Sequence, residues 1–188
     1  MKNIVIFASG SGSNAEKIID YFSTNKHARV RCILTNNATA KVIAVAKKNK
    51  IPTKLFDKFE LEDGHVLKYL VDLKPDIIVL AGFLLQFPQS ILQVFENKVI
   101  NIHPALLPKY GGKGMYGINV HKAIFNHSES DSGITIHFVT EHYDEGAFIF
   151  QKTISISDCE TPEEIAKKIL QLEHLYYSEQ IEKLLTSI

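Results

Sequence analysis

Residues 4–22 read IVIFASGSGSNAEKIIDYF, and this stretch decides the class of fold. Residues 4–8 are continuously apolar and predict a short buried strand. A turn of glycines and serines follows. Residues 14–21, with Phe22 next to them, then carry apolar side chains at helical spacing. A buried strand that passes through a glycine turn into a helix is typical of a parallel α/β sheet.

The same alternation continues to about residue 102. Further strands are predicted at residues 30–34, 77–81 and 99–102. Further helices are predicted at residues 40–49, 61–73 and 91–95. This βαβα pattern predicts a parallel sheet with helices packed on both faces.

Beyond residue 130 the pattern changes. Residues 132–139 alternate between the two faces of a strand, and residues 148–156 are also strand-like. These two runs are predicted to pair antiparallel at the edge of the sheet. A helix start follows at 161–164, with Thr161 as N-cap and Glu164 completing a capping box, and the helix is expected to run to about residue 185.

No internal repeat, linker or low-complexity stretch interrupts the 188 residues. We therefore predict a single α/β domain over residues 1–188. Its architecture is expected to be a Rossmann-like, mostly parallel twisted sheet flanked by helices, with an antiparallel edge near the C-terminus.

Composition and charge argue against several classes of protein. Lys plus Arg and Asp plus Glu both number 21, so an extended basic surface for nucleic acid is not expected. No apolar run approaches the roughly 20 residues that span a bilayer, and residues 4–8 are too short for the core of a signal peptide. Cys32 and Cys159 lack metal-ligand spacing and form no disulfide framework, which favours a reducing, cytoplasmic location.

The loop SGSGSN at residues 9–14 lies between the first strand and the first helix. Backbone N–H groups at a helix N-terminus are free, and the helix dipole favours negative charge there. The loop lacks the third glycine of a dinucleotide fingerprint and the lysine of a P-loop, so a single small phosphate suits it better. The alternative is a tight glycine turn in which Ser13 caps the helix.

Asn101 and His103 follow the apolar residues 99 and 100, where a strand ends. Residues two apart point to the same side of a strand, so both side chains should face one spot. The amide offers N–H donors and the imidazole titrates near neutrality, which together predict a site that polarises a carbonyl and moves a proton. The alternative is a structural histidine beside an asparagine that forms a turn.

Asp144 is a candidate third member of that site. It lies in the loop that follows the alternating run at 132–139. A carboxylate beside an imidazole favours the charged imidazolium and can accept a proton.

Four motifs carry a family resemblance: GSGSN (10–14), AGF (81–83), NIHPALLPKY (101–110) and HFVTEHYDEG (137–146). Together they resemble the folate-dependent formyltransferase family, and within it the enzymes that act on phosphoribosylglycinamide. The motifs occur in the family's order and the resemblance covers essentially the whole chain. It implies transfer of a formyl group from 10-formyltetrahydrofolate, a co-substrate, to the amine of 5-phosphoribosylglycinamide in purine biosynthesis, without a metal ion.

The resemblance also implies the catalytic residues, which are Asn101, His103 and Asp144. The substrate amine is expected to attack the formyl carbon directly. Asn101 and His103 would stabilise the oxyanion that forms, and Asp144 would raise the pKa of His103 and help to move the proton.

The expected binding residues rest on the same resemblance. Gly12, Ser13 and Asn14 would hold the substrate phosphate, and Glu173 would contact the ribonucleotide. The residues expected to bind the folate are Leu84, Leu85, Gln86, Phe87, Asn101, Thr140, Glu141, His142, Tyr143 and Asp144. The alternatives are an exposed helix face for Glu173 and plain core for the apolar members of the folate set.

Residues 111–117 read GGKGMYG. Four glycines in seven residues give the backbone unusual freedom. This segment is predicted to be a mobile lid over the site.

Other interpretations remain open at this point. Related members of the family hydrolyse formyltetrahydrofolate or formylate amino sugars, and a nucleotide-binding module without catalysis would share the architecture. The expected partners are the two small-molecule substrates, with neither nucleic acid nor membrane, and the chain is expected to be a monomer or a homodimer.

Overall fold

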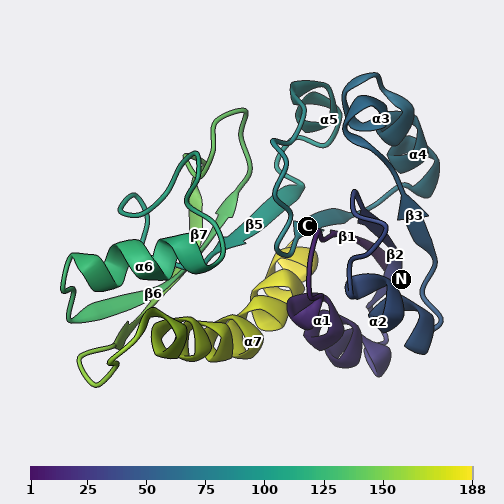
Figure 1. Cartoon of the computed structure of the whole chain (residues 1–188). Coiled ribbons are helices and arrows are strands. Elements are labelled where there is room, and N and C mark those ends of the chain that lie inside the picture. Colours follow the sequence, from purple (N-terminus) through teal and green to yellow (C-terminus); the bar gives the residue numbers. More distant parts are fainter. Residues whose placement is uncertain (188) are drawn as a thin grey trace.

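The computed structural model describes residues 1–187. One sheet contains seven strands: β1 (Lys2–Phe7), β2 (Ala28–Thr35), β3 (Thr53–Leu55), β4 (Ile77–Leu80), β5 (Val99–His103), β6 (Asp131–Phe138) and β7 (Phe148–Ser155). Their order across the sheet is β3-β2-β1-β4-β5-β6-β7. In Figure 1 the sheet crosses the molecule from β3 on the right to β7 on the left.

The first five strands of the chain run parallel, and β6 and β7 pair antiparallel at one edge. The predicted mostly parallel sheet with an antiparallel edge is therefore confirmed. β1 lies between β2 and β4, so the chain leaves β1 on one side and later returns on the other. In open α/β sheets, ligands bind outside the carboxyl ends of the strands at such a reversal.

Helices cover both faces of the sheet, as predicted. They are α1 (Ser13–Ser23), α2 (Val42–Lys48), α3 (Lys58–Glu62), α4 (His65–Leu73), α5 (Gln89–Val94), α6 (Ile118–Asn126) and α7 (Pro162–Ser187). We call the side covered by α1, α2, α6 and α7 the α7 face, and the side covered by α3, α4 and α5 the α4 face. Figure 1 shows α7 crossing from the region of α6 and β6 to α1.

β1 supplies both hydrophobic cores. Ile4 and Ile6 pack in the core of the α7 face, whereas Val5 and Phe7 pack in the core of the α4 face. Successive side chains of a strand point to opposite faces, so a strand buried on both sides must be apolar at every position. This is why residues 4–8 are continuously apolar.

The prediction of a single helix at residues 61–73 is wrong, because the structure has two helices there. α3 ends at Glu62 and α4 begins at His65, with Gly64 between them at φ 96°. Glycine adopts this left-handed conformation readily, and it interrupts a helix. α3 also begins earlier than predicted, where Asp57 and Glu60 form a capping box.

The structure contains two elements that the sequence analysis did not predict, β3 and α6. β3 has only three residues and pairs with β2 at the other edge of the sheet. α6 follows the glycine-rich residues 111–117 and buries Val120 and Ile124 on the α7 face. The remaining predicted strands and helices are present, with ends that differ by a few residues.

The start of α7 is predicted in part. The hydroxyl of Thr161 accepts a hydrogen bond from the N–H of Glu164 at 3.2 Å, so the N-cap is confirmed. In a capping box the carboxylate of Glu164 would accept the N–H of the N-cap residue, Thr161. It accepts the N–H of the preceding residue, Glu160, at 2.7 Å instead, so the predicted capping box is incomplete.

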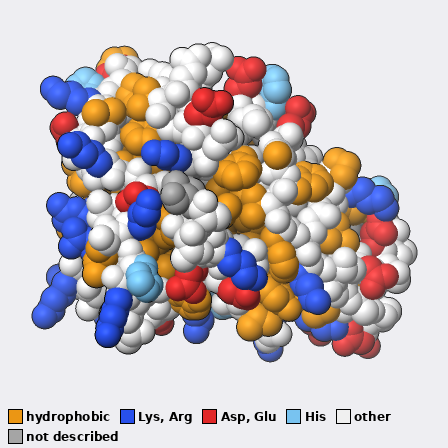
Figure 2. Space-filling model, turned by 180° about the vertical axis from the view of Figure 1, so that it is seen from behind, with side chains coloured by type: hydrophobic (Ala, Val, Ile, Leu, Met, Phe, Trp, Pro, Cys, Tyr) orange, Lys and Arg blue, Asp and Glu red, His pale blue; other side chains and the backbone are white. Residues whose placement is uncertain are grey.

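The face shown in Figure 2 has hydrophobic side chains exposed across its middle, with basic and acidic side chains interspersed around them. Within residues 1–187, no helix combines the length and the apolar character needed to cross a membrane.

Candidate active site

A cavity of about 790 Å³ opens at the carboxyl ends of β1, β4 and β5. Its walls are the segments that follow these strands, the glycine-rich segment before α6, the loop after β6 and one side of α7. The cavity therefore lies where the order of strands reverses, and it extends from the α7 face to the α4 face.

The glycine/serine loop forms the wall next to β1. Gly12 precedes α1 at φ 76°, and no side chain caps the helix. A Cβ on Gly12 would lie 2.7–2.8 Å from atoms of Val42, so only glycine fits between α1 and α2. Ser13 is the first helical residue, which excludes the alternative in which Ser13 is the N-cap. The N–H groups of the first turn of α1 have no acceptor within the helix, and the first of them, on Ser13, donates to the hydroxyl of Ser11 at 3.5 Å. This end of the helix consequently borders the cavity.

Asn14 and Glu173 join this loop to α7. The side-chain N–H of Asn14 donates to Oε2 of Glu173 at 2.6 Å, in a buried contact between residues 159 apart in sequence. Burial raises the pKa of Glu173 to about 7, although the bond from Asn14 opposes that rise. Glu173 is therefore a buried carboxyl that borders the cavity, and the expected alternative of an exposed helix face is excluded.

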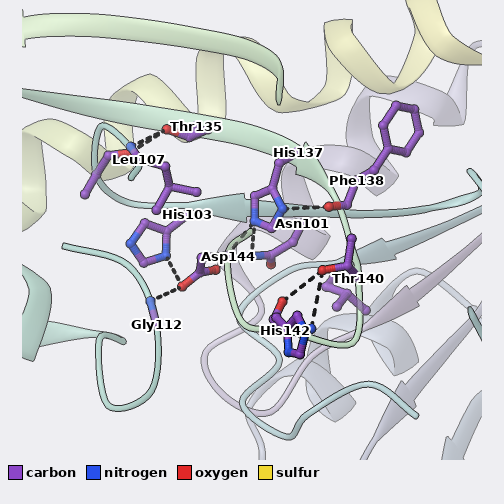
Figure 3. Close-up of polar contacts among 12 residues, drawn as sticks. Asn101, His103, Leu107, Gly112, Thr135, His137, Phe138, Thr140, His142 and Asp144 are labelled. Atoms are coloured by element: carbon purple, nitrogen blue, oxygen red, sulfur yellow. Dashed lines mark hydrogen bonds and ion pairs between the residues drawn. The ribbon is translucent and has the colours of Figure 1, made fainter. Parts of the chain in front are cut away.

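Asn101 and His103 lie at the carboxyl end of β5 and both border the cavity. Figure 3 shows them on either side of Asp144, which comes from the loop after β6. His103 is buried, with Nε2 2.8 Å from the carbonyl of Tyr110. Because a carbonyl only accepts, Nε2 carries a proton and Nδ1 is the nitrogen that faces Asp144.

Asp144 connects two imidazoles. Its Oδ2 lies 3.5 Å from Nδ1 of His103, and its Oδ1 lies 3.5 Å from Nε2 of His137. The backbone N–H of Gly112 also donates to Oδ2 at 2.9 Å. The backbone of Asp144 is left-handed, at φ 60°, a conformation that aspartate adopts more readily than most residues. The structure thus brings together the three polar residues that the sequence singled out.

The charges in this cluster oppose one another. Burial would raise the pKa of Asp144, but the nearby His137 ring, the charge of His103 and the N–H of Gly112 together outweigh burial and lower the pKa. For His103, burial is the larger effect and lowers the pKa, while Asp144 and the carbonyl of Tyr110 act in the opposite direction. The expectation that Asp144 raises the pKa of His103 describes its own effect correctly, but the net direction is downward.

His137 was missed as a site residue. It lies opposite Asn101 in the antiparallel pairing of β5 and β6. Its Nδ1 lies 2.8 Å from the carbonyl of Phe138, so in the neutral form Nδ1 donates there and Nε2 accepts the amide N–H of Asn101 at 3.2 Å. The alternation of residues 132–139 contained a signal, but the partner of His137 depends on the register of two strands.

The residues expected to bind folate differ in their surroundings, and among them Leu85 and Phe87 pack in the core of the α4 face. Leu84 is half exposed, whereas Phe87 is buried against Phe7, with ring centroids 5.1 Å apart. Phe87 therefore belongs to the core as well as to the wall. Its neighbour Gln86 donates to the backbone carbonyl of Glu141 at 2.7 Å.

That bond ties the loop after β4 to the loop after β6. Of the expected folate residues, only Glu141 lies outside the wall of the main cavity, and it borders a smaller hollow beside it. The others line the main cavity: Leu84, Leu85, Gln86, Phe87, Asn101, Thr140, His142, Tyr143 and Asp144.

The glycine-rich segment closes the remaining side. Gly112, Gly114 and Gly117 all have positive φ angles, and residues 112–117 border the cavity. The segment thus lies where a lid would lie, and its movement stays a prediction. Among residues 1–187, no group of three or more His, Cys, Asp or Glu side chains is placed to hold a metal ion.

Comparison with known proteins decides the family. The family model described as "Formyl transferase" matches residues 2–181. The chain belongs to the formyl transferase family. Two similar plant proteins are both named "Phosphoribosylglycinamide formyltransferase, chloroplastic". The protein from Arabidopsis thaliana is 40% identical to this chain over 187 residues, and the protein from Vigna unguiculata is 37% identical over 189 residues.

These matches cover 96% and 97% of this family member, and the chain spans only 64% and 61% of the two plant relatives. A solved structure of similar size agrees over nearly its whole length. The crystal structure of phosphoribosylglycinamide formyltransferase from Bacillus halodurans matches with a TM-score of 0.89 and 32% identity, covering 98% of this chain and 95% of that one.

Proposed function

We propose that this formyl transferase family member transfers a formyl group from 10-formyltetrahydrofolate to the amine of 5-phosphoribosylglycinamide, a step of purine biosynthesis. The observation that carries the proposal is that Asn101, His103 and Asp144 share one cavity with the free N-terminus of α1. A phosphate site and a formyl-transfer centre in one cavity match a substrate with a phosphate at one end and an amine at the other. The printed names of the relatives support the same substrate.

The ribonucleotide phosphate binds at Gly12, Ser13 and Asn14. The N–H groups of the first turn of α1 have no acceptor within the helix, and the helix dipole favours an anion. Glu173 uses Oε2 to accept from Asn14, which leaves Oε1 to accept a hydroxyl group of the ribose.

The folate binds at the α4-face end of the cavity. Leu84, Leu85 and Val139 give that end an apolar wall for a flat ring, and Thr140 with neighbouring backbone groups supplies hydrogen-bonding partners. The bond between Gln86 and the carbonyl of Glu141 holds the two loops together on either side of the ring.

Asn101 stabilises the developing oxyanion. One N–H of its amide is directed to Nε2 of His137, which fixes the orientation of the group. The second N–H remains available for the formyl oxygen when the substrate amine attacks the formyl carbon. Such a preset donor needs no reorientation during the reaction, which is the basis of its catalytic effect.

His103 and Asp144 move the proton. The neutral imidazole of His103 accepts the proton of the attacking amine at Nδ1, because Nε2 is occupied as a donor to Tyr110. Asp144 stabilises the imidazolium that results. The proton then passes to the nitrogen that leaves as the bond between the folate and the formyl carbon breaks.

An assay for deformylated folate tests this proposal. The purified protein is mixed with 10-formyltetrahydrofolate and with one amine at a time, and absorbance is followed. We expect turnover with 5-phosphoribosylglycinamide only. Turnover without any amine would identify a hydrolase, turnover with an amino-sugar nucleotide alone would identify the other transferase, and binding without turnover would identify a nucleotide-binding module.

Three further properties belong to the same proposal. Residues 1–188 form one formyltransferase domain, it acts in the cytoplasm, and it works on small molecules as a monomer or homodimer without nucleic acid or membrane. Two free cysteines, Cys32 and Cys159, suit a reducing compartment. Analytical ultracentrifugation and cell fractionation test the oligomeric state and the location.

A further inference from the structure

His121 is a cavity residue for which the proposed mechanism has no role. It lies on α6, lines the cavity and is only 5% exposed. Its Nδ1 is fully buried and has no hydrogen-bond partner among residues 1–187. A buried imidazole without a partner is costly, so its presence beside a ligand cavity calls for a ligand.

The proton position follows from the surroundings of the ring. A buried N–H without an acceptor is rarer in proteins than a buried acceptor without a donor. The proton therefore avoids Nδ1 and resides on Nε2 in the neutral ring. Because Nδ1 is enclosed by the fold, the edge that carries Nε2 is the one that borders the cavity.

His121 belongs to the ribonucleotide half of the cavity. Its neighbours Val120 and Ile124 pack in the core of the α7 face together with α7, and Glu173 of α7 borders the same cavity. The folate half is built from residues such as Phe87, which pack in the core of the α4 face. α6 therefore places His121 on the α7 side of the cavity, the side of Glu173, rather than on the side of Phe87.

The ring also stays uncharged. Burial lowers the pKa of His121 to about 4, and the charge of His103 adds to this effect. His121 and His103 line the same cavity. A neutral donor at this place suits a neutral acceptor of the substrate, rather than its phosphate.

We propose that His121 donates an Nε2–H hydrogen bond to the amide carbonyl of the glycinamide group, and so holds the arm that carries the reacting amine. This inference rests on the proposed function. With the phosphate at Gly12 and the amine beside His103, the carbonyl is the substrate acceptor nearest to the amine, since its carbon is bonded to the carbon that bears the nitrogen. His121 is then a residue that selects and orients the nucleophile.

Calorimetric binding tests the contact. His121→Leu removes the donor at similar volume, and His121→Gln replaces it with an amide N–H. A neutral hydrogen bond has a net value of about 0.5–1.5 kcal/mol, so His121→Leu should weaken binding of phosphoribosylglycinamide about 2- to 13-fold. Ribose 5-phosphate, which lacks the amide, should bind both proteins equally, and His121→Gln should restore part of the loss. The neighbouring, exposed Lys122 supplies the control variant Lys122→Leu, which should bind as the wild type does.

Two measurements separate this role from a structural one. His121→Leu should unfold at the same temperature as the wild type or above it, because a buried nitrogen without a partner is removed. In long-range proton–nitrogen spectra of the free wild type, Nδ1 of His121 should carry no proton. A proton on Nδ1, or equal weakening of both ligands with a lower unfolding temperature, would overturn the inference.

The outcomes also distinguish the two proposals. If the wild type binds and formylates phosphoribosylglycinamide and His121→Leu binds it equally well, the inference is wrong and the proposed function stands. If the wild type does not bind phosphoribosylglycinamide, the proposed function fails and this inference fails with it.

Discussion

The imidazole of His103 lies between two groups: Nε2 donates to the carbonyl of Tyr110 at 2.8 Å, and Nδ1 lies 3.5 Å from the carboxylate of Asp144. Burial disfavours its charged form and Asp144 favours it, and burial has the larger effect. The pKa of His103 therefore lies below its ordinary value of 6.5 in the free protein. This shift favours the uncharged ring, which is the form that can accept a proton.

Asp144→Asn should lower the pKa of His103 still further. The amide retains an acceptor for the N–H of Gly112 but loses the negative charge that favours the imidazolium. Titration of the His103 ring by NMR measures the change, with Asp158→Asn as a control on an exposed carboxylate. A pKa that is unchanged or raised in Asp144→Asn would contradict this account of the charges.

Asn101→Ala should lower kcat by about 10²–10³-fold, the usual effect of removing one oxyanion donor. The amide contacts His137 rather than the glycine/serine loop, so binding of the ribonucleotide should change little. Steady-state kinetics and calorimetry separate the two quantities. A loss of less than tenfold in kcat would show that Asn101 does not stabilise the transition state.

At the scale of the element, the turn between β1 and α1 determines where the proposed phosphate site lies. Gly12 has a left-handed backbone and packs against Val42 at the start of α2. The N–H of Val42 also donates to the carbonyl of Gly10 at 3.2 Å. The turn is therefore shaped by its contact with the next helix as well as by its own glycines.

Gly12→Ala should destabilise the fold by about 2–4 kcal/mol, through backbone strain and collision of the new Cβ with Val42. Weaker binding of the ribonucleotide should accompany it. Gly10→Ala is the matched control, since its Cβ would meet no atom within 4 Å and its φ is not positive, and it should cost less than about 1 kcal/mol. Urea denaturation measures both, and equal stability of the two variants would refute this explanation.

At the scale of the whole molecule, the bond between Asn14 and Glu173 joins the first helix to the last. It closes the cavity between α1 and α7 with a carboxyl that burial keeps protonated up to a pH of about 7. In the unfolded chain the same carboxyl ionises near its ordinary pKa of 4.5. The folded state consequently loses up to about 3 kcal/mol of stability as the pH rises from 4.5 to 7.

Glu173→Gln should remove that loss. Above pH 7 the variant should have a free energy of unfolding higher than the wild type by up to about 3 kcal/mol, and the difference should vanish below about pH 4.5. Binding of the ribonucleotide should weaken, because the oxygen proposed to accept a ribose hydroxyl is replaced by an NH2 group, which cannot accept. Denaturation at pH 4.5 and pH 8 measures the first effect. If the variant is no more stable than the wild type at pH 8, burial does not raise the pKa of Glu173 in the folded protein.

Much of the fold could be predicted because its signals are local. Residues 4–8 are apolar at every position, so burial on both faces can be recognised from the sequence alone. The alternation of residues 132–139 identifies a strand but not its burial, because Thr135 and His137 are as buried as Ile134 and Ile136. The helix at 61–73 was predicted wrongly because Gly64 was not recognised as a break. β3 was missed because three residues are too few to show a period.

The sequence by itself determined the alternating order of strands and helices, the position of the glycine/serine loop and the shared direction of Asn101 and His103. These depend on spacing along one strand or at one helix end, which hydrophobic pattern and backbone geometry decide. Only the tertiary structure decided that His137 holds Asn101, that Glu173 reaches Asn14, and that burial outweighs Asp144 at His103. These depend on strand register, on helix packing across 159 residues and on the exclusion of water, none of which acts within a local stretch of chain.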